Sequence, residues 1–354
     1  MDTVPARAGR ATLAAVAASA GVSVATVSKV LNGRSDVSPA TRALVQSYLK
    51  QHGYVASPRR RDSTDRPTLE VTMDAEMNAY STEIIQGVLL AAAEADASVV
   101  VGVRTDGPHG NGSGPDRSSA WARGLVAAGR RAVIAVTSEL TAEHLTALAR
   151  AHLPLVVIDP LDLPRARVTS IGSTNFSGGL AATQHLLRLG HRRIGYIGGP
   201  ATAACNQARV HGYLAAMEAG GALVPAEYVR TGHFHFDDGV AGGAELLDLA
   251  EPPTAVFAGN DETAFGVVEA ARTRGLRVPE DLSIVGFDDT QMARMASPPL
   301  TTIRQPLREM GGVAVRTALR LAAGEKIDSH HVELATELIV RGSTAPPRAT
   351  IERE

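Results

Sequence analysis

The stretch Ala11–Gly33, ATLAAVAASAGVSVATVSKVLNG, has the pattern of two short helices joined by a tight turn. Thr12 can cap the first helix, and Gly21 stands where that helix needs a final residue that tolerates positive φ. Ser23 can then cap the second helix. Apolar residues recur at helical spacing on the inward sides: Val16, Ala17, Ala20, Val27, Val30 and Leu31. The pattern predicts a helix-turn-helix, although an ordinary helical hairpin has the same caps and spacing.

The outward side of the second helix suits contact with DNA. A rotation of about 100° per residue places Ala25, Ser28 and Lys29 opposite the apolar side. This surface is small, polar and cationic. A helix that enters a major groove about 12 Å wide needs such a surface, because bulky apolar groups would be neither buried nor useful there.

A third helix is indicated shortly after this stretch. Ser38 can cap it, Pro39 fits its first position, and Gly53 marks its end. Three helices in about 45 residues predict a small core of the kind found in compact DNA-binding domains.

The composition limits the class of protein. A chain of 354 residues is too long for one small domain and suits two or three hydrophobic cores. The single cysteine, Cys205, excludes an internal disulfide and fits a reducing compartment. Neither an apolar run of about 18 residues nor a charged-then-apolar leader is present. We therefore expect a cytoplasmic protein without a membrane span.

Charge is distributed unevenly along the chain. Residues 1–66 contain ten Lys or Arg against four acidic residues, a net charge of +6, so the remainder carries −8 of the total of −2. A basic N-terminal module on an acidic body is typical of a protein that touches phosphate with one end only. Basic tails also occur on proteins that bind no nucleic acid, so the charge supports the motif without proving it.

From Leu69 onward, segments typical of strands and helices alternate. The predicted strands are residues 69–73, 98–103, 132–136, 155–158, 194–197, 255–258 and 283–285. The predicted helices are residues 82–95, 118–128, 141–152, 176–189, 203–219, 236–249 and 261–274. This alternation predicts an α/β fold with two lobes, each a doubly wound parallel sheet covered by helices.

Polar residues follow several of the predicted strands. Asp159 follows one strand, Asn260 and Asp261 follow another, and Asp288 and Asp289 follow a third. In open α/β sheets, ligands bind beyond the carboxyl ends of the strands, so these side chains are candidates for a binding site. Each also has a structural interpretation, because an Asp at a strand end can simply cap the next helix.

Signals of catalysis and of cofactor or metal binding are weak. Cys205 has no assigned His partner, and neither Gly-x-Ser-x-Gly nor His-Glu-x-x-His occurs. The Gly-rich segment 106–116 lacks the spacing of a phosphate-binding loop. The histidines, among them His185 and His191, have no companions at metal-ligand spacing. We therefore predict a protein that is not an enzyme and needs neither cofactor nor metal.

Longer motifs resemble the lactose-repressor (LacI/GalR) family of bacterial transcription regulators. They are VAASAGVSVATVSKVLNG, VSPATRALVQSYLKQHGY, LGHRRIGYIGGP, the spacing Arg209-x-x-Gly212-Tyr213, AVFAGND, VPEDLSIVGFDD and PPLTTIRQP, which together span nearly all of residues 11–343. The resemblance implies a three-helix headpiece on a two-lobed body like that of periplasmic binding proteins. It also implies a homodimer that binds double-stranded operator DNA.

The resemblance assigns residues to domains and to DNA contacts. The implied domains are a helix-turn-helix at 10–56, a linker at 57–67 and an effector-binding and dimerisation domain at 68–343, with lobe 1 at about 68–162 and 293–325 and lobe 2 at about 163–292 and 326–343. Val24, Ala25 and Lys29 match positions that face bases. Ser23, Thr26, Ser28 and Asn32 match positions that contact phosphate or the turn.

The resemblance also implies an effector cleft between the lobes. The matching positions are Asp74, Tyr80, Asp159, Arg209, Phe234, Asn260, Asp288 and Gln305. Carboxylates, an amide and an Arg can hold paired sugar hydroxyls while an aromatic ring covers the sugar, so this set suggests a carbohydrate. The implied function is a repressor of carbohydrate-utilisation genes. A nucleobase or nucleoside effector, and a cytosolic sugar-binding module, are the alternatives.

The linker departs from the family pattern. Ser57-Pro58 stands where Pro-Asn is usual, and residues 59–67 contain no apolar side chain for a wedge into the minor groove. Arg59 to Arg61 can instead meet phosphates or a narrow minor groove. A solvated flexible linker is an equally good interpretation.

Overall fold

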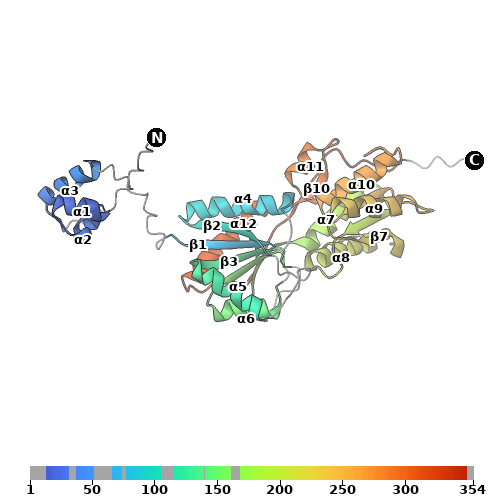
Figure 1. Ribbon diagram of the computed structural model, residues 1–354. Helices are drawn as coiled ribbons and strands as arrows, with labels where there is room; N and C mark the ends of the chain where they lie inside the picture. Colours follow the sequence, from blue (N-terminus) through green and yellow to red (C-terminus); the bar gives the residue numbers. More distant parts are fainter. Residues whose placement is uncertain are drawn as a thin grey trace, which may run out of the picture. The chain divides into compact units, whose positions relative to one another are not determined.

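The computed structural model describes residues 13–31, 37–51, 66–73, 77–104, 115–138, 140–160 and 168–348. The chain divides into two compact units, residues 1–65 and 66–354 (Figure 1). The first unit is the helical headpiece, and the second is an α/β body.

The described part of the headpiece contains three short helices. They are α1 (Leu13–Ala20), α2 (Val24–Leu31) and α3 (Pro39–Gln51). Gly21 has φ +63°, as the predicted turn requires. Two of the three predicted caps are confirmed, because Ser23 Oγ accepts from the Thr26 N–H at 3.1 Å and Ser38 Oγ from the Thr41 N–H at 3.2 Å. The third, Thr12, lies outside the described residues, as does Gly53. The buried side chains of the headpiece form one small core: Val16, Ala17, Ala20, Val27, Val30 and Val45.

The first lobe of the body is built on a parallel sheet. Its strands in spatial order are β11 (His331–Leu334), β5 (Thr169–Ser173), β4 (Leu155–Ile158), β3 (Arg130–Val136), β1 (Thr68–Met73) and β2 (Ser98–Val103). The helices α4 (Ala79–Glu94) and α12 (Leu307–Ala322) cover one face, and α5 (Pro115–Ala127) and α6 (Ala142–Arg150) cover the other. On β3, Ile134 faces the first pair and Val133 the second, which explains why this strand is apolar from Ala132 to Val136.

The second lobe repeats this plan with one antiparallel edge. Its strands in spatial order are β12 (Glu337–Ile339), β10 (Thr301–Arg304), β9 (Ser283–Asp288), β8 (Ala255–Ala258), β6 (Ile194–Gly198) and β7 (Val229–Thr231). Helices α7 (Asn175–Arg188) and α8 (Ala204–Ala219) share one core with the sheet, and α9 (Phe236–Leu247) and α10 (Asp261–Thr273) share another. A short helix, α11 (Gln291–Met295), precedes β10. The predicted α/β class with two doubly wound lobes is confirmed.

The lobes divide at other residues than the predicted ones. β5, which we expected in lobe 2, pairs with β4 in lobe 1, and β11 pairs with β5 there as well. β10, which we expected in lobe 1, pairs with β9 in lobe 2. These short strands are recognisable only by their backbone partners, because their few residues show no clear periodicity. The crossings between lobes therefore lie at residues 173–175, 305–306 and 335–336.

Glycines allow α7 and α8 to pack closely in the second lobe. A Cβ on Gly179 would lie 2.3 Å from the Arg209 carbonyl oxygen, and one on Gly212 would lie 2.3 Å from the Phe176 carbonyl oxygen. Real side chains do not approach backbone so closely. The two glycines therefore fix how near α8, which carries Arg209, lies to α7.

Replacing Gly212 with alanine is expected to lower the free energy of unfolding by about 1–3 kcal/mol, because the new methyl group overpacks this contact. The matched control is Gly124→Ala in α5, where nothing lies within 4 Å of the added Cβ. That change should stabilise the fold by up to about 1 kcal/mol, since alanine is the better helix former. Urea unfolding of both variants measures the effects, and equal effects would contradict the close contact.

Candidate functional site

The solvent-facing side of α2 carries the residues predicted to meet DNA. Ser23, Val24, Ala25 and Lys29 are exposed, and Thr26 and Ser28 are half-buried. Val24 is apolar and yet 47% exposed, which costs nothing if a thymine methyl group covers it in a complex. Asn32 lies outside the described residues. The helix thus presents a short apolar tip flanked by hydroxyls and one amine.

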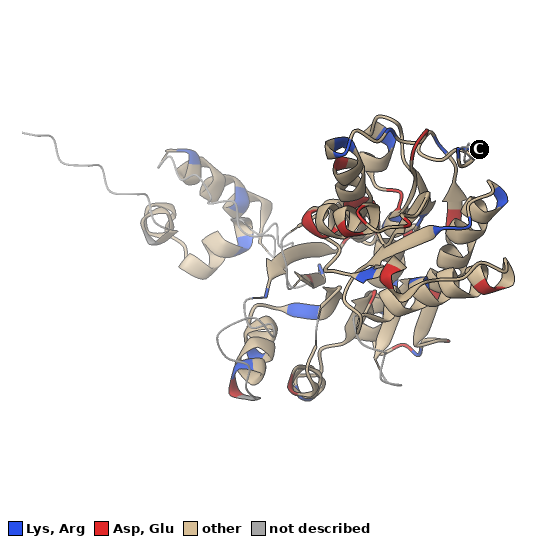
Figure 2. Cartoon of the chain, turned by 90° about the vertical axis from the view of Figure 1, so that its right-hand side faces the viewer, with Lys and Arg blue, Asp and Glu red and all other residues tan. Residues whose placement is uncertain are grey.

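The described headpiece is basic. Its charged residues are Lys29, Arg42 and Lys50, and residues 13–31 and 37–51 include no Asp or Glu (Figure 2). Lys and Arg side chains neutralise phosphates, which is the main source of affinity for DNA. The linker through Asp65, with Arg59 to Arg61, lies outside the described residues.

The body contains a second candidate site, at the carboxyl ends of its strands. Asp159, Phe234 and Asp288 all have positive φ, at 45°, 68° and 114°. Such backbone conformations are strained for residues other than glycine and are typically retained where function requires them. The strain supports a binding role for these residues rather than helix capping.

The half-buried Tyr80 and the buried Asp159 form a hydrogen-bonded pair within lobe 1. Tyr80 Oη, from α4, donates to Asp159 Oδ2 at 2.6 Å. Burial raises the pKa of the Asp159 carboxyl, and the hydroxyl of Tyr80 and the charge of Arg209 oppose this shift. The pKa of Tyr80 is raised well above its usual value, by burial and by the neighbouring carboxyl. Tyr80 therefore remains a hydrogen-bond donor near neutral pH.

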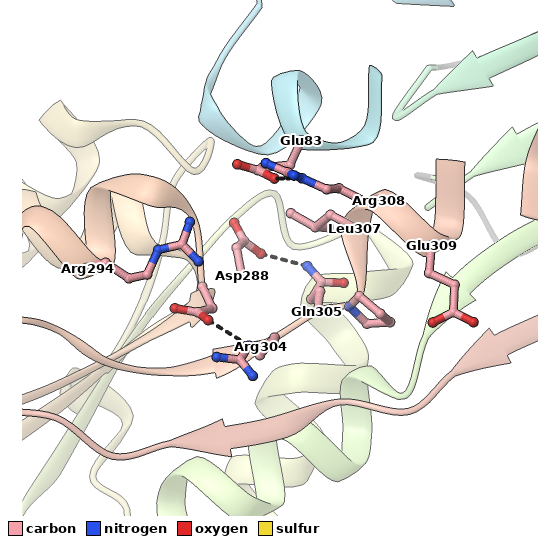
Figure 3. Close-up of a pocket in the computed structure, with 10 residues that line it drawn as sticks. Glu83, Asp288, Arg294, Arg304, Gln305, Leu307, Arg308 and Glu309 are labelled. Atoms are coloured by element: carbon pink, nitrogen blue, oxygen red, sulfur yellow. Dashed lines mark hydrogen bonds and ion pairs between the residues drawn. The ribbon is translucent and has the colours of Figure 1, made fainter. Parts of the chain in front are cut away.

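Asp288 and Gln305 meet at the wall of a cavity. Gln305 Nε2 donates to Asp288 Oδ1 at 2.6 Å, and burial raises the pKa of Asp288 well above its usual value. Both residues line a cavity of about 360 Å³, together with Leu307 and an ion pair of Glu83 with Arg308 from the first lobe (Figure 3). A cavity of this size holds a small polar ligand.

Arg209 is a buried cation of the second lobe. Its Nε donates to Asn175 Oδ1 at 2.8 Å and its Nη1 to the Gly259 carbonyl oxygen at 2.6 Å. The guanidinium carbon lies 3.9 Å from the centre of the Phe287 ring. These neutral partners orient the guanidinium, and the carboxyls of Asp159 and Asp288 act on it electrostatically. Arg209 is thus held in place by groups that leave its charge to interact with the cleft.

Phe234 forms an aromatic platform beside Arg209. Its ring lies against Gly199, where a Cβ would come within 2.0 Å of a ring carbon, and 5.6 Å from the Arg209 guanidinium. Asn260 Nδ2 donates to the Phe234 carbonyl oxygen at 2.9 Å, and Asn260 Oδ1 caps α10 by accepting from the Thr263 N–H. Asn260 therefore supports the platform and the helix, whatever else it contacts.

Several residues of this region were missed by sequence reasoning. Cys205, in the first turn of α8, lies one helical turn before Arg209 and within electrostatic range of Tyr80, Asp159 and Asp288. Burial raises the pKa of its thiol to about 11, so the thiol is protonated near neutral pH. The spacing of four residues to Arg209 was the available signal. Ser173 and Asn175 carried no such signal.

Two further candidate positions have other outcomes. Asp261 lies at a strand end but is fully used inside the fold, since it accepts from Thr302 Oγ1 at 2.6 Å and from the backbone N–H and the hydroxyl of Thr290. Burial raises its pKa to about 7. Asp74 lies outside the described residues.

The described residues contain neither a metal-site cluster nor a membrane-spanning helix. In the part of the chain that the structure describes, three or more His, Cys, Asp or Glu side chains nowhere gather as a metal site would require. Among the same residues, none of the helices has both the length and the apolar character needed to span a bilayer.

Comparisons with known proteins match both the headpiece and the body. Residues 12–57 match the family of bacterial regulatory proteins called the lacI family, and residues 183–344 match the periplasmic binding protein-like domain. The HTH-type transcriptional repressor CytR of Escherichia coli (strain K12) is 33% identical over 336 residues, which cover 94% of this chain and 96% of that protein. The regulator CelR of Thermobifida fusca is 34% identical, with coverage of 94% and 98%.

Solved structures give the same result. A complex of the transcriptional regulator CelR with cellobiose has a TM-score of 0.70 at 34% identity and covers 94% of this chain and 100% of its own. The lac repressor dimer bound to operator and the anti-inducer ONPF has a TM-score of 0.75 at 28% identity, with coverage of 95% and 100%. This chain therefore belongs to the lacI family of bacterial regulatory proteins and is a DNA-binding transcriptional regulator controlled by a small molecule.

Proposed function

We propose that this regulator is a cytoplasmic homodimer that represses carbohydrate-utilisation genes and leaves its operator when a sugar or oligosaccharide enters the cleft. The observation that carries the proposal is the combination of a half-buried Phe234 platform with the carboxyls of Asp159 and Asp288 around the oriented Arg209. An aromatic face covers a sugar ring, and the polar groups hold its hydroxyls in pairs.

Relatives support a sugar as the effector class. CelR occurs in complex with cellobiose, and a ribose operon repressor of Escherichia coli is 32% identical over 94% of this chain. A flat nucleobase would also stack on Phe234 and bond to Gln305. Nucleobases and nucleosides are therefore the second effector class, and the test must include them.

We also propose that the cleft binds without catalysis. Its thiol, Cys205, is protonated near neutral pH because burial raises its pKa to about 11, which makes it a poor nucleophile. The carboxyls of Asp159 and Asp288 are each engaged by a hydrogen bond that positions them. This arrangement suits recognition of hydroxyls.

Lys29→Ala is expected to weaken operator binding by about 1–3 kcal/mol and to relax the preference for one base pair, because an amine in the groove donates to a guanine edge. The measurement is a fluorescence-anisotropy titration against operator variants selected from random DNA. Lys50→Ala, on α3, is the matched control and should weaken binding to all sequences alike. A uniform loss for Lys29→Ala would reduce it to a phosphate contact.

A thermal-shift screen of the full chain against mono- and oligosaccharides should find a stabiliser. At 100 times its dissociation constant, a ligand adds about 2.7 kcal/mol to the stability of the folded state. We expect the same compound to release bound operator. Stabilisation by nucleobases or nucleosides alone would contradict the sugar assignment and leave the DNA-binding assignment intact.

Asp288→Asn should abolish this stabilisation at the concentrations that saturate the parent, because the amide replaces one of the two acceptor oxygens of the carboxylate with an NH2 donor. Operator binding should be unchanged. The control is Asp248→Asn, the same substitution at the exposed residue that follows the last turn of α9. This variant should respond to the effector like the parent. Loss of operator binding together with effector binding would indicate misfolding of Asp288→Asn.

The dimer is proposed to form along the β2 edge of lobe 1. This strand ends the sheet and exposes Val100, Val101 and Val103, and the adjacent α4 exposes Leu89 and Leu90. An apolar edge strand exposed to water is a template for pairing with another chain. A second copy related by a two-fold axis would cover it and join two headpieces on one operator.

Val101→Lys is expected to convert the dimer into a monomer, because a charge would be buried in the pairing surface. Sedimentation velocity measures the change. Leu223→Lys, at a loop residue that is 90% exposed, is the control and should remain dimeric. A dimeric Val101→Lys would place the interface elsewhere.

A further inference from the structure

Hydrogen bonds tie together the three crossings between the lobes. Thr336 in the third crossing donates its N–H to Thr174 Oγ1, in the first crossing, at 3.0 Å. The Thr174 N–H in turn donates to the Leu334 carbonyl oxygen at 2.9 Å. Gln305, in the second crossing, is joined to the first by Ser173, whose Oγ donates to Gln305 Oε1 at 2.5 Å. The crossings thus form one hydrogen-bonded hinge.

One branch of this hinge passes through the effector cleft. Ser173 closes β5 in lobe 1, Gln305 follows β10, and Asp288 ends β9 in lobe 2. The Gln305 side chain accepts from Ser173 and donates to Asp288, and its backbone N–H donates to the Asp288 carbonyl oxygen at 3.2 Å. The three residues are only 1%, 3% and 4% exposed. A single buried chain therefore connects the lobes through a residue of the cleft.

Asp288 sets the direction of this hydrogen-bonded chain, because its carboxylate accepts from the Gln305 amide, and the Ser173 hydroxyl, which can donate or accept, satisfies the other end of that amide. A glutamine amide has a donor end and an acceptor end, and the Ser173 hydroxyl takes the acceptor end. The donor end is directed at the Asp288 carboxyl. The opposite orientation would place two acceptors, Gln305 Oε1 and an Asp288 oxygen, against each other in a buried place, which is costly. Ser173 does not itself line the cavity.

We propose that Ser173 is a positioning residue that, through Gln305 and Asp288, holds the two lobes at their relative angle. An effector hydroxyl that takes over the Gln305 amide or the Asp288 carboxyl then breaks the chain and frees the hinge. This second step rests on the proposed effector cleft. The positioning role of Ser173 does not rest on that cleft, because the hydrogen bonds from Ser173 through Gln305 to Asp288 form without a ligand.

Cys205 provides a reporter of the hinge that needs no effector. It is the only cysteine of the sequence, it is half-buried, and it lies within electrostatic range of Asp159 of lobe 1 and Asp288 of lobe 2. Its rate of alkylation by iodoacetamide at a fixed pH therefore rises when the lobes separate more often. The measurement uses the full chain without added ligand.

Ser173→Ala is expected to raise this rate roughly fivefold, the change in opening that the loss of one hydrogen bond produces. Ser173→Thr retains the hydroxyl and should restore the parent rate. Ser170→Ala is the matched control, since Ser170 is on the same strand, is similarly buried, and bonds to His331 at 3.0 Å instead of to the hinge. It should alkylate at the parent rate.

The proposal would be overturned if Ser173→Ala unfolds cooperatively, and so is properly folded, but is alkylated at the same rate as the parent protein. It would also be overturned if Ser170→Ala raised the alkylation rate as much as Ser173→Ala. Gln305→Leu removes both side-chain bonds and should give at least the rise seen in Ser173→Ala. Both substitutions break the same series of hydrogen bonds, so the double variant Ser173→Ala with Gln305→Leu should be alkylated no faster than Gln305→Leu alone. A rate increase equal to the product of the two single increases would overturn the proposal. If these rates behave as expected while the ligand screen finds nothing, the hinge is supported and the proposed effector class fails.

Discussion

The buried guanidinium of Arg209 is the constraint on which the cleft depends. A cation removed from water requires partners that replace its hydration, and here they are Asn175, the Gly259 carbonyl oxygen and the Phe287 ring. Those partners come from α7, the end of β8 and β9, so the charge is held only when the lobe is fully assembled. The glycine contact of α7 with α8 brings the guanidinium within reach of them. A packing requirement and an electrostatic one therefore meet at a single side chain.

Two carboxyl residues of the cleft could be predicted from the sequence, because ligands of open α/β sheets bind beyond the carboxyl ends of the strands. Asp159 and Asp288 follow apolar strands that any reading of the periodicity finds, and their positive φ gives them a second, structural mark. Cys205, Ser173 and Asn175 could not be found in this way. Ser173 ends a short strand whose identity depends on pairing with β4 and β11, and Asn175 matters only because α8 packs against α7. Such roles depend on contacts between segments far apart in sequence.

Headpiece and body differ in how local their determinants are. The caps at Ser23 and Ser38 and the positive φ of Gly21 act within a few residues, so the sequence predicts them directly. The body is the opposite case. Its helices α4 to α10 were predicted within a few residues of their ends, but α11 and α12 were not predicted. The division into lobes was wrong at β5, β10 and β11, since short strands take their membership from partners elsewhere in the chain.

The three crossings also determine the order in which the molecule is completed during synthesis. The headpiece core uses a continuous run of chain, and all of it leaves the ribosome early. Lobe 1 needs α12 and β11, so its sheet has all its described strands only after translation has passed residue 334. Lobe 2 needs β12, and its sheet is complete only after residue 339. Long-range pairings of this kind form late. A nascent or prematurely ended chain thus carries the DNA-reading helices before it carries the means to control them.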